Sequence, residues 1–408
     1  KCTPVVFIDR QTIFVQEVYK GENMMTDLCR YKLQNNVHIV SGAKNHCIYN
    51  LNSRKLYHLD SEHLEFLYRL VSEDYEKVPV EVREFFIKEG IVIPGDSASA
   101  EEISPYQYEK NIDFAWIEIT QRCNLYCRHC YESSSKNVEI SDMTMQDFET
   151  AVKALHSMGI KRIQLVGGEP LVHPQIAEMI KIAKDTFDFV EVYTNGTLLT
   201  DELLELITDR KVALAFSLYA ADSAVHDYVT CTKGSYILTI DSIQKALDLG
   251  NTVRVASVEM KDIPRYVFDD KRAMARADLP RVTGRAGLHL YSRDMLRRKL
   301  ITKESFRRPV SADDFLQNQK IHNCFGSRLY VDCKLDVYPC VMERRLTYGN
   351  IKEIPITQMV GTKPAFLTKD KIKGCKDCEF RYACFDCRPD SNGNEIYDKP
   401  WYCTYDPQ

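Results

Sequence analysis

The chain has 408 residues, of which 44% are hydrophobic and 27% charged, and its formal net charge is −4. This composition is typical of a globular protein and excludes a strongly basic nucleic-acid-binding protein. No apolar run approaches the roughly 20 residues of a membrane span, so we expect neither nucleic acid nor membrane as a partner. The length exceeds one compact core, which predicts two or three domains.

Cysteine is unusually abundant, with 15 residues in the chain. Three of these cysteines lie between residues 123 and 130, and eight lie beyond residue 320. Residues 1–4 show no signal-peptide pattern, so we expect a cytoplasmic protein. Because the cytoplasm keeps thiols reduced, clustered cysteines predict metal sites rather than disulfides.

The sequence of residues 1–95 predicts a small module of strands and two helices. Alternating apolar residues and turn signals place strands at 36–40, 47–51, 55–59 and 91–93 and helices after residues 60 and 79. Gly90 is a natural left-handed stop for the second helix. The small residues at 94–100 mark a domain boundary, so residues 96–112 form the expected linker.

A hairpin beside short helices resembles the winged-helix-like module that binds the leader segment of ribosomally made precursor peptides. The resemblance implies that residues 1–95 recognise such a peptide, which would add to a strand edge. The alternative is a stabilising or dimerising cap.

Residues 113–308 alternate strand-like and helix-like segments. Strands are expected at 114–120, 162–166, 190–193, 214–217 and 253–256, with helices between them. This repetition predicts an α/β fold whose parallel sheet is closed, or partly closed, into a barrel. In such folds the chemistry lies at the carboxyl ends of the strands.

Short motifs follow the first four of these strands. They are Cys-x3-Cys-x2-Cys at 123–130, Gly-Gly-Glu-Pro at 167–170, Thr-Asn-Gly at 194–196 and Ser-Leu-Tyr at 217–219. Thiolates are the soft ligands that zinc and iron–sulfur clusters select. A closed site needs four ligands, so either a distant residue supplies the fourth or one iron is left open to a small molecule.

Together these motifs resemble the radical S-adenosylmethionine (SAM) enzymes over roughly residues 113–290. The resemblance implies a partial (β/α)6 barrel and a 4Fe–4S cluster held by Cys123, Cys127 and Cys130, with SAM chelating the fourth iron. The SAM contacts that it implies are His129, Gly167, Gly168, Glu169, Asn195, Ser217 and Arg254. For Arg254, a structural ion pair is the alternative. The resemblance assigns no catalytic side chain.

Residues 281–308 hold nine Lys or Arg residues against two acids. A solvated surface is the simplest explanation, and contact with an acidic peptide is the alternative.

Seven cysteines of residues 309–408 have a ligand-like spacing. They are Cys324, Cys340, Cys375, Cys378, Cys384, Cys387 and Cys403. Two Cys-x2-Cys pairs alone would favour zinc, but seven thiols exceed one tetrahedral site. The pattern resembles the SPASM extension of radical SAM enzymes, which binds two auxiliary 4Fe–4S clusters. The two-residue spacing between Cys384 and Cys387 resembles maturases paired with ATP-grasp enzymes.

The resemblance also implies how these cysteines divide between the clusters. Auxiliary cluster I would use Cys324, Cys340 and Cys387, with Cys333 or an open iron in the fourth place. Auxiliary cluster II would use Cys375, Cys378, Cys384 and Cys403.

The implied activity is maturation of a ribosomally synthesised precursor peptide. Reductive cleavage of SAM would give a 5′-deoxyadenosyl radical, which abstracts hydrogen before a thioether or carbon–carbon cross-link forms. An electron donor such as flavodoxin or ferredoxin would reduce the cluster. The alternatives are an anaerobic sulfatase-maturating (formylglycine-generating) enzyme, a peptide epimerase and a non-enzymatic iron–sulfur electron carrier.

Overall fold

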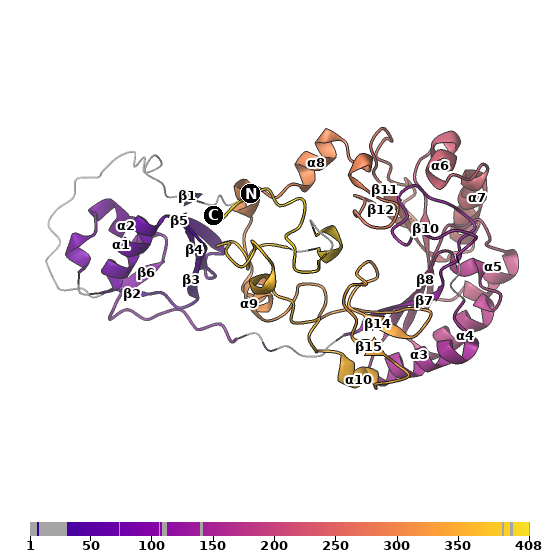
Figure 1. The fold of residues 1–408 in the computed structure, drawn as a ribbon, viewed down its shortest axis with the longest axis horizontal. Helices are drawn as coiled ribbons and strands as arrows, with labels where there is room; N and C mark the ends of the chain where they lie inside the picture. Colours follow the sequence, from indigo (N-terminus) through magenta and orange to yellow (C-terminus); the bar gives the residue numbers. More distant parts are fainter. Residues whose placement is uncertain are drawn as a thin grey trace.

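The computed structural model describes residues 31–72, 74–105, 107, 112–138, 142–385, 387–391 and 395–407, and the backbone of residues 6–7. Most of the first 30 residues, and residues 106 and 108–111 of the predicted linker, lie outside these ranges. The molecule is elongated (Figure 1). The N-terminal module lies at one end, the parallel sheet and its helices lie at the other, and the C-terminal residues lie between them.

The N-terminal module combines two small sheets with two helices. Its strands are β1 (Val6–Phe7), β2 (Tyr31–Leu33), β3 (Val37–Ser41), β4 (His46–Asn50), β5 (Lys55–Leu59) and β6 (Val92–Pro94), and its helices are α1 (Ser61–Val71) and α2 (Val80–Lys88). The larger sheet has the order β1-β5-β4-β3, and β2 pairs with β6. The Asp60 carboxylate caps α1 by accepting a 2.9 Å hydrogen bond from the His63 amide. Beyond α2, Gly90 has a φ of +62°, which confirms that this glycine ends the second predicted helix. The antiparallel pairing of β4 with β5 confirms the predicted hairpin.

The central strand β4 is buried on both faces. Ile48 packs with the cluster that includes α1 and α2. Tyr49 faces the other way, toward Phe315 and Phe380 of the C-terminal region. The Tyr49 hydroxyl donates a 3.0 Å hydrogen bond to the Glu379 carbonyl oxygen. The module is therefore packed against the C-terminal region by apolar contact and by hydrogen bonds.

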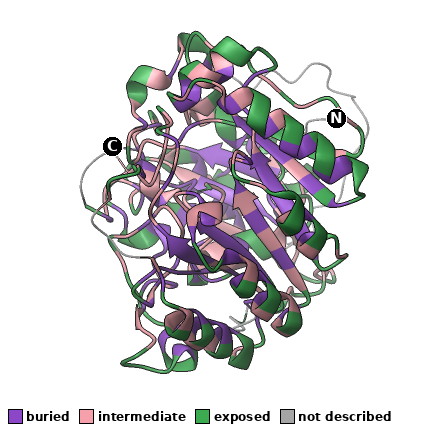
Figure 2. Ribbon diagram, turned by 90° about the vertical axis from the view of Figure 1, so that its right-hand side faces the viewer, coloured by how far each residue is buried: buried purple, intermediate pink, exposed green. Residues whose placement is uncertain are grey.

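A parallel sheet forms the other end of the molecule. Its strands are β7 (Phe114–Thr120), β8 (Arg162–Gly167), β9 (Phe189–Thr194), β10 (Val212–Ser217), β11 (Thr252–Val258) and β12 (Ala273–Asp278), and the helices between them are α3 (Met145–Ser157), α4 (Ile176–Thr186), α5 (Asp201–Ile207), α6 (Ser223–Thr230) and α7 (Ser235–Asp248). Each strand runs parallel to its sequence neighbours. The strands are largely buried and the helices expose their outer faces (Figure 2). The predicted α/β class is confirmed.

Alternation along β7 explains how the sheet separates two environments. Ala115, Ile117 and Ile119 are fully buried in the core that the helices cover. Trp116 and Glu118 point to the opposite face, toward the inside of the partial barrel. One side of each strand therefore builds the core, and the other side is free to carry polar groups.

The C-terminal region contains short elements and long irregular segments. Its helices are α8 (Arg293–Lys299), α9 (Ala312–Lys320) and α10 (Ile356–Met359), and its strands are β13 (Leu329–Val331), β14 (Asp336–Tyr338) and β15 (Gly349–Asn350). β13 runs parallel to β7 along its other edge. The sheet thus continues across the domain boundary predicted between residues 308 and 309, and this boundary stays a prediction.

Part of the basic stretch 281–308 is buried against the C-terminal region. Lys299 Nζ lies 2.8 Å from Asp390 Oδ2, and Arg281 Nη1 lies 3.3 Å from the same atom. The Lys299 side chain is only 7% exposed. A solvated surface is therefore the wrong explanation for these two residues, because they bind a carboxylate of the chain itself.

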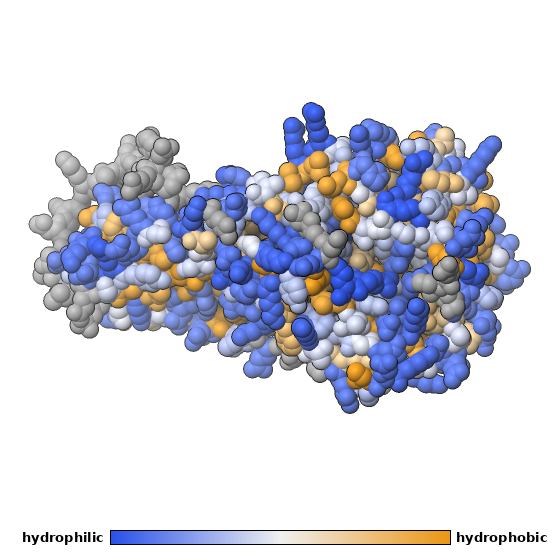
Figure 3. Space-filling model, viewed as in Figure 1, coloured by the Kyte–Doolittle hydropathy of each residue, from blue (hydrophilic) through white to orange (hydrophobic). Residues whose placement is uncertain are grey.

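The face of the molecule in Figure 3 is dominated by hydrophilic residues, with hydrophobic residues scattered between them. None of the described helices is long and apolar enough to cross a membrane.

Candidate active site at the carboxyl ends of the strands

The predicted cluster and SAM residues follow four adjacent strands. The cysteine loop, residues 121–135, follows β7, Gly167 ends β8, Asn195 follows β9 and Ser217 ends β10. Because β7 to β10 are parallel neighbours, these residues lie along one edge of the sheet. The motifs therefore share one edge, as the sequence predicts.

The Cys123 thiol is buried, and the neighbouring Cys127 and Cys130 are half-buried. Burial raises the pKa of Cys123 to about 12 and holds the pKa of Cys127 well above its usual value, and the nearby Cys130 raises both. The Leu125 amide nevertheless points at Cys123 Sγ, with an N···S distance of 3.4 Å. Hydrogen bonds of this kind stabilise cluster-bound sulfur, and a cluster would supply the positive charge that buried thiolates need. The residues therefore fit a cluster.

The described cysteines are arranged as free thiols. No disulfide links the described cysteines. Within the described ranges, no three His, Cys, Asp or Glu side chains converge on a single metal ion. A 4Fe–4S cluster binds each thiolate through a different iron, so it needs thiols spread around it.

Gly167 and Gly168 bring two backbone segments into direct contact. The Gly168 amide donates a 2.9 Å hydrogen bond to the Thr120 carbonyl, and the Glu169 amide donates one of 2.9 Å to the Arg122 carbonyl. A Cβ at Gly167 would clash with the Thr120 oxygen, and one at Gly168 with the Arg122 oxygen. Glycine is therefore needed where the end of β8 fixes the start of the cysteine loop.

Glu169 is fully buried and ties β8 to β9. Its Oε1 accepts hydrogen bonds from Thr194 Oγ1 at 2.7 Å and the Leu171 amide at 3.0 Å, and its Oε2 accepts one from the Asn195 amide at 2.6 Å. Burial raises the pKa of Glu169 to about 7, against the lowering effect of these hydrogen bonds. A bound cation would favour the carboxylate form, so this environment fits the amino group of SAM.

Asn195 connects the end of β9 back to the cysteine loop. Its Nδ2 donates a 2.9 Å hydrogen bond to Asn124 Oδ1, and Asn124 Nδ2 donates one of 2.7 Å to Thr197 Oγ1. Asn124 directly follows Cys123, so this network fixes the first ligand against β9. Sequence reasoning missed Asn124 and Thr197, although Asn124 stands inside the cysteine motif.

Tyr219 packs beneath the cysteine loop. It is buried, and Cys127 packs against it. Its ring centroid lies 4.6 Å from that of His129 and 5.4 Å from that of His226. Burial lowers the pKa of His129 to about 4, so the ring is neutral near pH 7, and its Nδ1 has no hydrogen-bond partner in the described part of the chain. A buried neutral ring fits the adenine contact implied for His129.

Arg254 lies on β11, level with the middle of β10 rather than with its carboxyl end. It forms a bidentate ion pair with Glu191, with Nε–Oε1 at 2.9 Å and Nη2–Oε2 at 2.6 Å. Glu191 also accepts a hydrogen bond from Gln164, which accepts one from Trp116. Arg254 therefore forms a structural ion pair, which was the alternative to a SAM contact in the sequence analysis. A SAM contact by Arg254 stays a prediction.

The segment at Gly284 holds the far end of the cysteine loop. The Arg285 amide donates a 2.9 Å hydrogen bond to the Cys130 carbonyl, and Arg285 Nε donates one of 2.8 Å to the Cys127 carbonyl. Gly284 has a φ of +61°, and a Cβ there would clash with the carbonyl oxygens of Cys130 and Tyr131. Sequence reasoning missed this contact because 158 residues separate Arg285 from Cys127, and no local signal joins them.

Cys324, Cys340 and Cys387 form a second group of thiols. Burial and the nearby Cys324 raise the pKa of Cys340, and burial and the nearby Cys340 raise the pKa of Cys387. Cys340 Sγ accepts a 3.4 Å hydrogen bond from the Met342 amide, and Cys324 Sγ accepts one of 3.4 Å from the Asn323 side chain. This grouping agrees with the ligand set implied for auxiliary cluster I, which stays a prediction.

Cys333 lies elsewhere, at the edge of the large apolar core and beside Glu118. Its Sγ is 3.4 Å from the Glu118 carbonyl oxygen and 3.5 Å from Glu118 Oε2. Burial raises the pKa of Cys333 far above its usual value, and the charged groups that add most are Glu118 and Asp332 rather than a cysteine. This position gives no support to Cys333 as a ligand of auxiliary cluster I.

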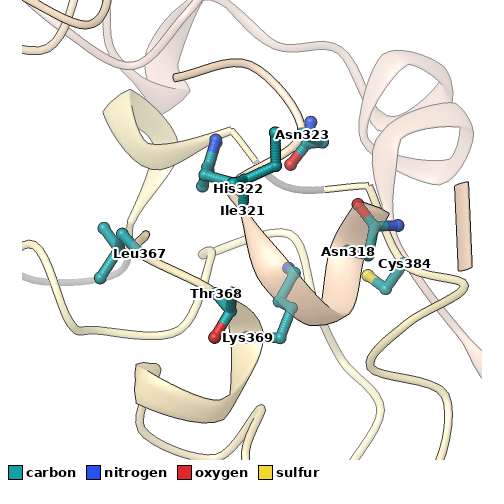
Figure 4. Close-up of a pocket in the computed structure, with 8 residues that line it drawn as sticks. All are labelled: Asn318, Ile321, His322, Asn323, Leu367, Thr368, Lys369 and Cys384. Atoms are coloured by element: carbon teal, nitrogen blue, oxygen red, sulfur yellow. The ribbon is translucent and has the colours of Figure 1, made fainter. Parts of the chain in front are cut away.

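Two small adjoining hollows, both partly open to solvent, lie in the C-terminal region. One is lined by several residues that include the four thiols implied for auxiliary cluster II: Cys375, Cys378, Cys384 and Cys403. The other lies between α9 and residues 367–369 (Figure 4). Cys384 and Lys369 line both hollows. Four thiols around one hollow fit a cluster there, although the assignment stays a prediction.

Comparison with known proteins identifies the family of the parallel sheet. A model described as the radical SAM superfamily matches residues 117–263. The antilisterial bacteriocin subtilosin biosynthesis protein AlbA of Bacillus subtilis is 37% identical over 144 residues, which is 35% of this chain and 32% of AlbA. The AdoMet-dependent heme synthase of Methanosarcina barkeri is 26% identical over 343 residues, which is 72% of this chain and 96% of the synthase. The chain thus spans about a third of AlbA and nearly all of the heme synthase.

A solved structure shares the fold over most of the chain. Streptococcus suis SuiB bound to precursor peptide SuiA matches with a TM-score of 0.54 and 15% identity, over 92% of this chain and 100% of that one. The 117–263 match contains the cysteine motif and every strand end described above. Residues 117–263 therefore carry a radical SAM domain.

Proposed function

We propose that this protein is a radical SAM enzyme that matures a ribosomally synthesised peptide by oxidative cross-linking, through a thioether or a carbon–carbon bond. The observation that carries the proposal is the cysteine loop with its strand-end residues, in a chain that shares its fold with SuiB over 92% of its length. AlbA, which is 37% identical to this chain over 144 residues, is named for the biosynthesis of the bacteriocin subtilosin. Both names point to a peptide substrate.

Three 4Fe–4S clusters and SAM are the cofactors of this proposal. Cys123, Cys127 and Cys130 hold the first cluster, and the two C-terminal thiol groups hold the auxiliary clusters. When bound, the first cluster and SAM supply a radical that abstracts hydrogen from an unactivated carbon. Glu169 binds the SAM amino group, while Asn195, Ser217 and neighbouring residues position the rest of SAM and exclude water.

The N-terminal module is the proposed leader-binding site. β3 is the outer strand of its four-stranded sheet in the described part of the chain. An outer strand offers unpaired backbone groups to an extended peptide, which adds as a further strand. Residues 1–95 would therefore hold the leader while the rest of the peptide reaches the partial barrel. The reducing cytoplasm, which keeps the ligand thiols reduced, is the compartment that this reaction needs.

Heme synthesis is the second candidate, because the match to the M. barkeri synthase covers 96% of that protein. That match covers only 72% of this chain, whereas the SuiB fold covers 92% of it and so includes part of the N-terminal module. A peptide substrate gives this module a role, because the outer strand β3 could bind the leader. A tetrapyrrole substrate gives it no such role. The peptide proposal therefore accounts for more of the chain.

Production of 5′-deoxyadenosine by the anaerobically reconstituted protein tests the proposal. With SAM and dithionite, we expect formation of this product, and faster formation when a candidate precursor peptide with its leader is added. Cys127→Ala is the matched control and should form none. No product in any mixture, or stimulation by a tetrapyrrole but not by peptides, would contradict peptide maturation.

A further inference from the structure

Two tyrosine–arginine pairs lie on the outer surface of the cysteine loop. The Arg128 guanidinium carbon lies 3.9 Å from the centroid of the Tyr228 ring, and that of Arg285 lies 4.0 Å from the centroid of the Tyr126 ring. Tyr126 is 53% exposed and Tyr228 is 56% exposed. We call these four residues the loop patch.

Backbone hydrogen bonds join the two halves of the loop patch. The Tyr126 amide donates to the Thr230 carbonyl at 3.1 Å, and the Arg128 amide donates to the Val229 carbonyl at 3.0 Å. The cysteine loop and α6 therefore form one surface. α6 lies at the end of the molecule away from the N-terminal module (Figure 1), so a protein bound here leaves that module accessible.

In the described part of the chain, neither arginine of the loop patch forms an ion pair with a carboxylate. The side-chain hydrogen bonds of Arg128 and Arg285 go to backbone carbonyls, of Tyr228 and Cys127 respectively. The nearby acids Asp222, which caps α6, and Asp227, on α6, accept hydrogen bonds from backbone amides instead. Exposed tyrosine and arginine together are typical of protein interfaces.

The loop patch also adjoins one proposed cluster ligand, Cys127. Tyr126 and Arg128 flank Cys127 in the chain, and Arg285 binds the Cys127 carbonyl at 2.8 Å. Electron transfer slows steeply with distance, so a donor protein must dock where the cluster comes close to the surface. Such encounters bury little area and depend on complementary charge.

We propose that the loop patch is the docking site of a small acidic one-electron carrier protein. The inference rests on the proposed function, because it needs a redox cluster on Cys123, Cys127 and Cys130. In the step that it serves, one electron passes from the reduced carrier to the cluster. The carrier is oxidised by one electron and the cluster is reduced by one, and no bond forms or breaks.

Titration with a purified acidic flavodoxin at low ionic strength tests the docking site directly. Arg128→Glu places a negative charge in the patch, so we expect the Kd for flavodoxin to rise about tenfold and to depend less on salt. Arg210→Glu is the matched control. Arg210 is an exposed arginine just before the amino-terminal end of β10, whereas the cysteine loop follows the carboxyl end of β7. An unchanged Kd for Arg128→Glu, or an equal rise for the control, would overturn the proposal.

A comparison of two reductants, dithionite and reduced flavodoxin, distinguishes failure of the docking site from failure of the proposed function. With dithionite, Arg128→Glu should cleave SAM at the wild-type rate, whereas with reduced flavodoxin it should be slower. Equal losses with both reductants would overturn docking, because the arginine would then act on the cluster itself. Absence of SAM cleavage by the wild type with dithionite would refute the proposed function, and the flavodoxin titration would still decide docking. If Arg128→Glu does not fold, Arg128→Gln tests the same expectation with a smaller rise in Kd.

Discussion

Gly168 is enclosed by the backbone at the start of the cysteine loop, where a Cβ would clash with the Arg122 carbonyl oxygen. We predict that Gly168→Ala displaces the loop, lowers the free energy of unfolding by about 1–3 kcal/mol and reduces bound iron. Gly159→Ala is the control. Gly159 has a φ of +84° but nothing within 4 Å of an added Cβ, so alanine adds about 1–2 kcal/mol of strain without loss of iron. Iron analysis and denaturant unfolding measure both effects, and full iron content in Gly168→Ala would contradict the prediction.

Cys333 lies against Glu118 and away from the grouped thiols. We therefore predict that Cys333→Ala keeps the iron and sulfide content of the wild type. Cys340→Ala, the matched control from the proposed ligand set, should lose the iron of one cluster. Loss of a whole cluster from Cys333→Ala would show that Cys333 is a ligand and would contradict the placement described here.

The sequence predicts the site residues to the extent that they stand in local motifs. Cys123, Gly168 and Ser217 follow strands that alternation reveals, and parallel strands align their ends. Gly168 also has a structural role that its motif does not reveal, because backbone carbonyls fill the space where a Cβ would lie. Its contact with SAM stays a prediction. Arg285 could not be predicted, since its contact with the loop depends on how distant segments pack.

Among the helices, α8 is fixed to residues 388–390 through Asp390. This carboxylate is fully buried and binds both Lys299 and Arg281. Removal of its charge leaves the buried Lys299 ammonium unpaired, so we predict that Asp390→Asn lowers the free energy of unfolding by about 3–5 kcal/mol. Asp294→Asn, which breaks the exposed ion pair with Arg298 on the same helix, should have little effect. Denaturant unfolding of the anaerobic holoenzyme compares them, and similar midpoints for both variants would contradict the prediction.

The strands and helices of residues 113–258 were predictable because each carries its own periodicity. The pairing of β13 with β7 could not be predicted. β13 is only three residues long, and more than 200 residues separate it from β7 in the chain. Parallel pairing of this kind is set by tertiary packing rather than by local sequence. The burial of Lys299 escaped prediction for the same reason.

On the scale of the whole molecule, the N-terminal module is anchored to the C-terminal region by Tyr49, whose ring is fully buried. We predict that Tyr49→Ala costs about 3–5 kcal/mol at this interface and speeds proteolytic separation of the module. Tyr68→Ala is the control, because Tyr68 lies on α1 and is 50% exposed. Limited proteolysis followed by mass spectrometry measures the rate, and equal rates for the two variants would show that Tyr49 does not hold the module.

This anchoring also affects how the leader-binding proposal is tested. Deletion of residues 1–100 would expose Phe315 and Phe380, which now pack against the module. A loss of activity would then have two explanations. Point substitutions on the outer strand β3 are therefore the cleaner test of leader binding.

If the protein cross-links a peptide as proposed, the reaction changes the mass of that peptide. A candidate precursor with its leader would be incubated anaerobically with the reconstituted protein, SAM and reductant, and then analysed by mass spectrometry. Cross-linking predicts a peptide lighter by two hydrogens, with no such change in the Cys127→Ala control. An unchanged peptide mass in the presence of active SAM cleavage, or one deuterium gained from heavy water without other change, would contradict cross-linking.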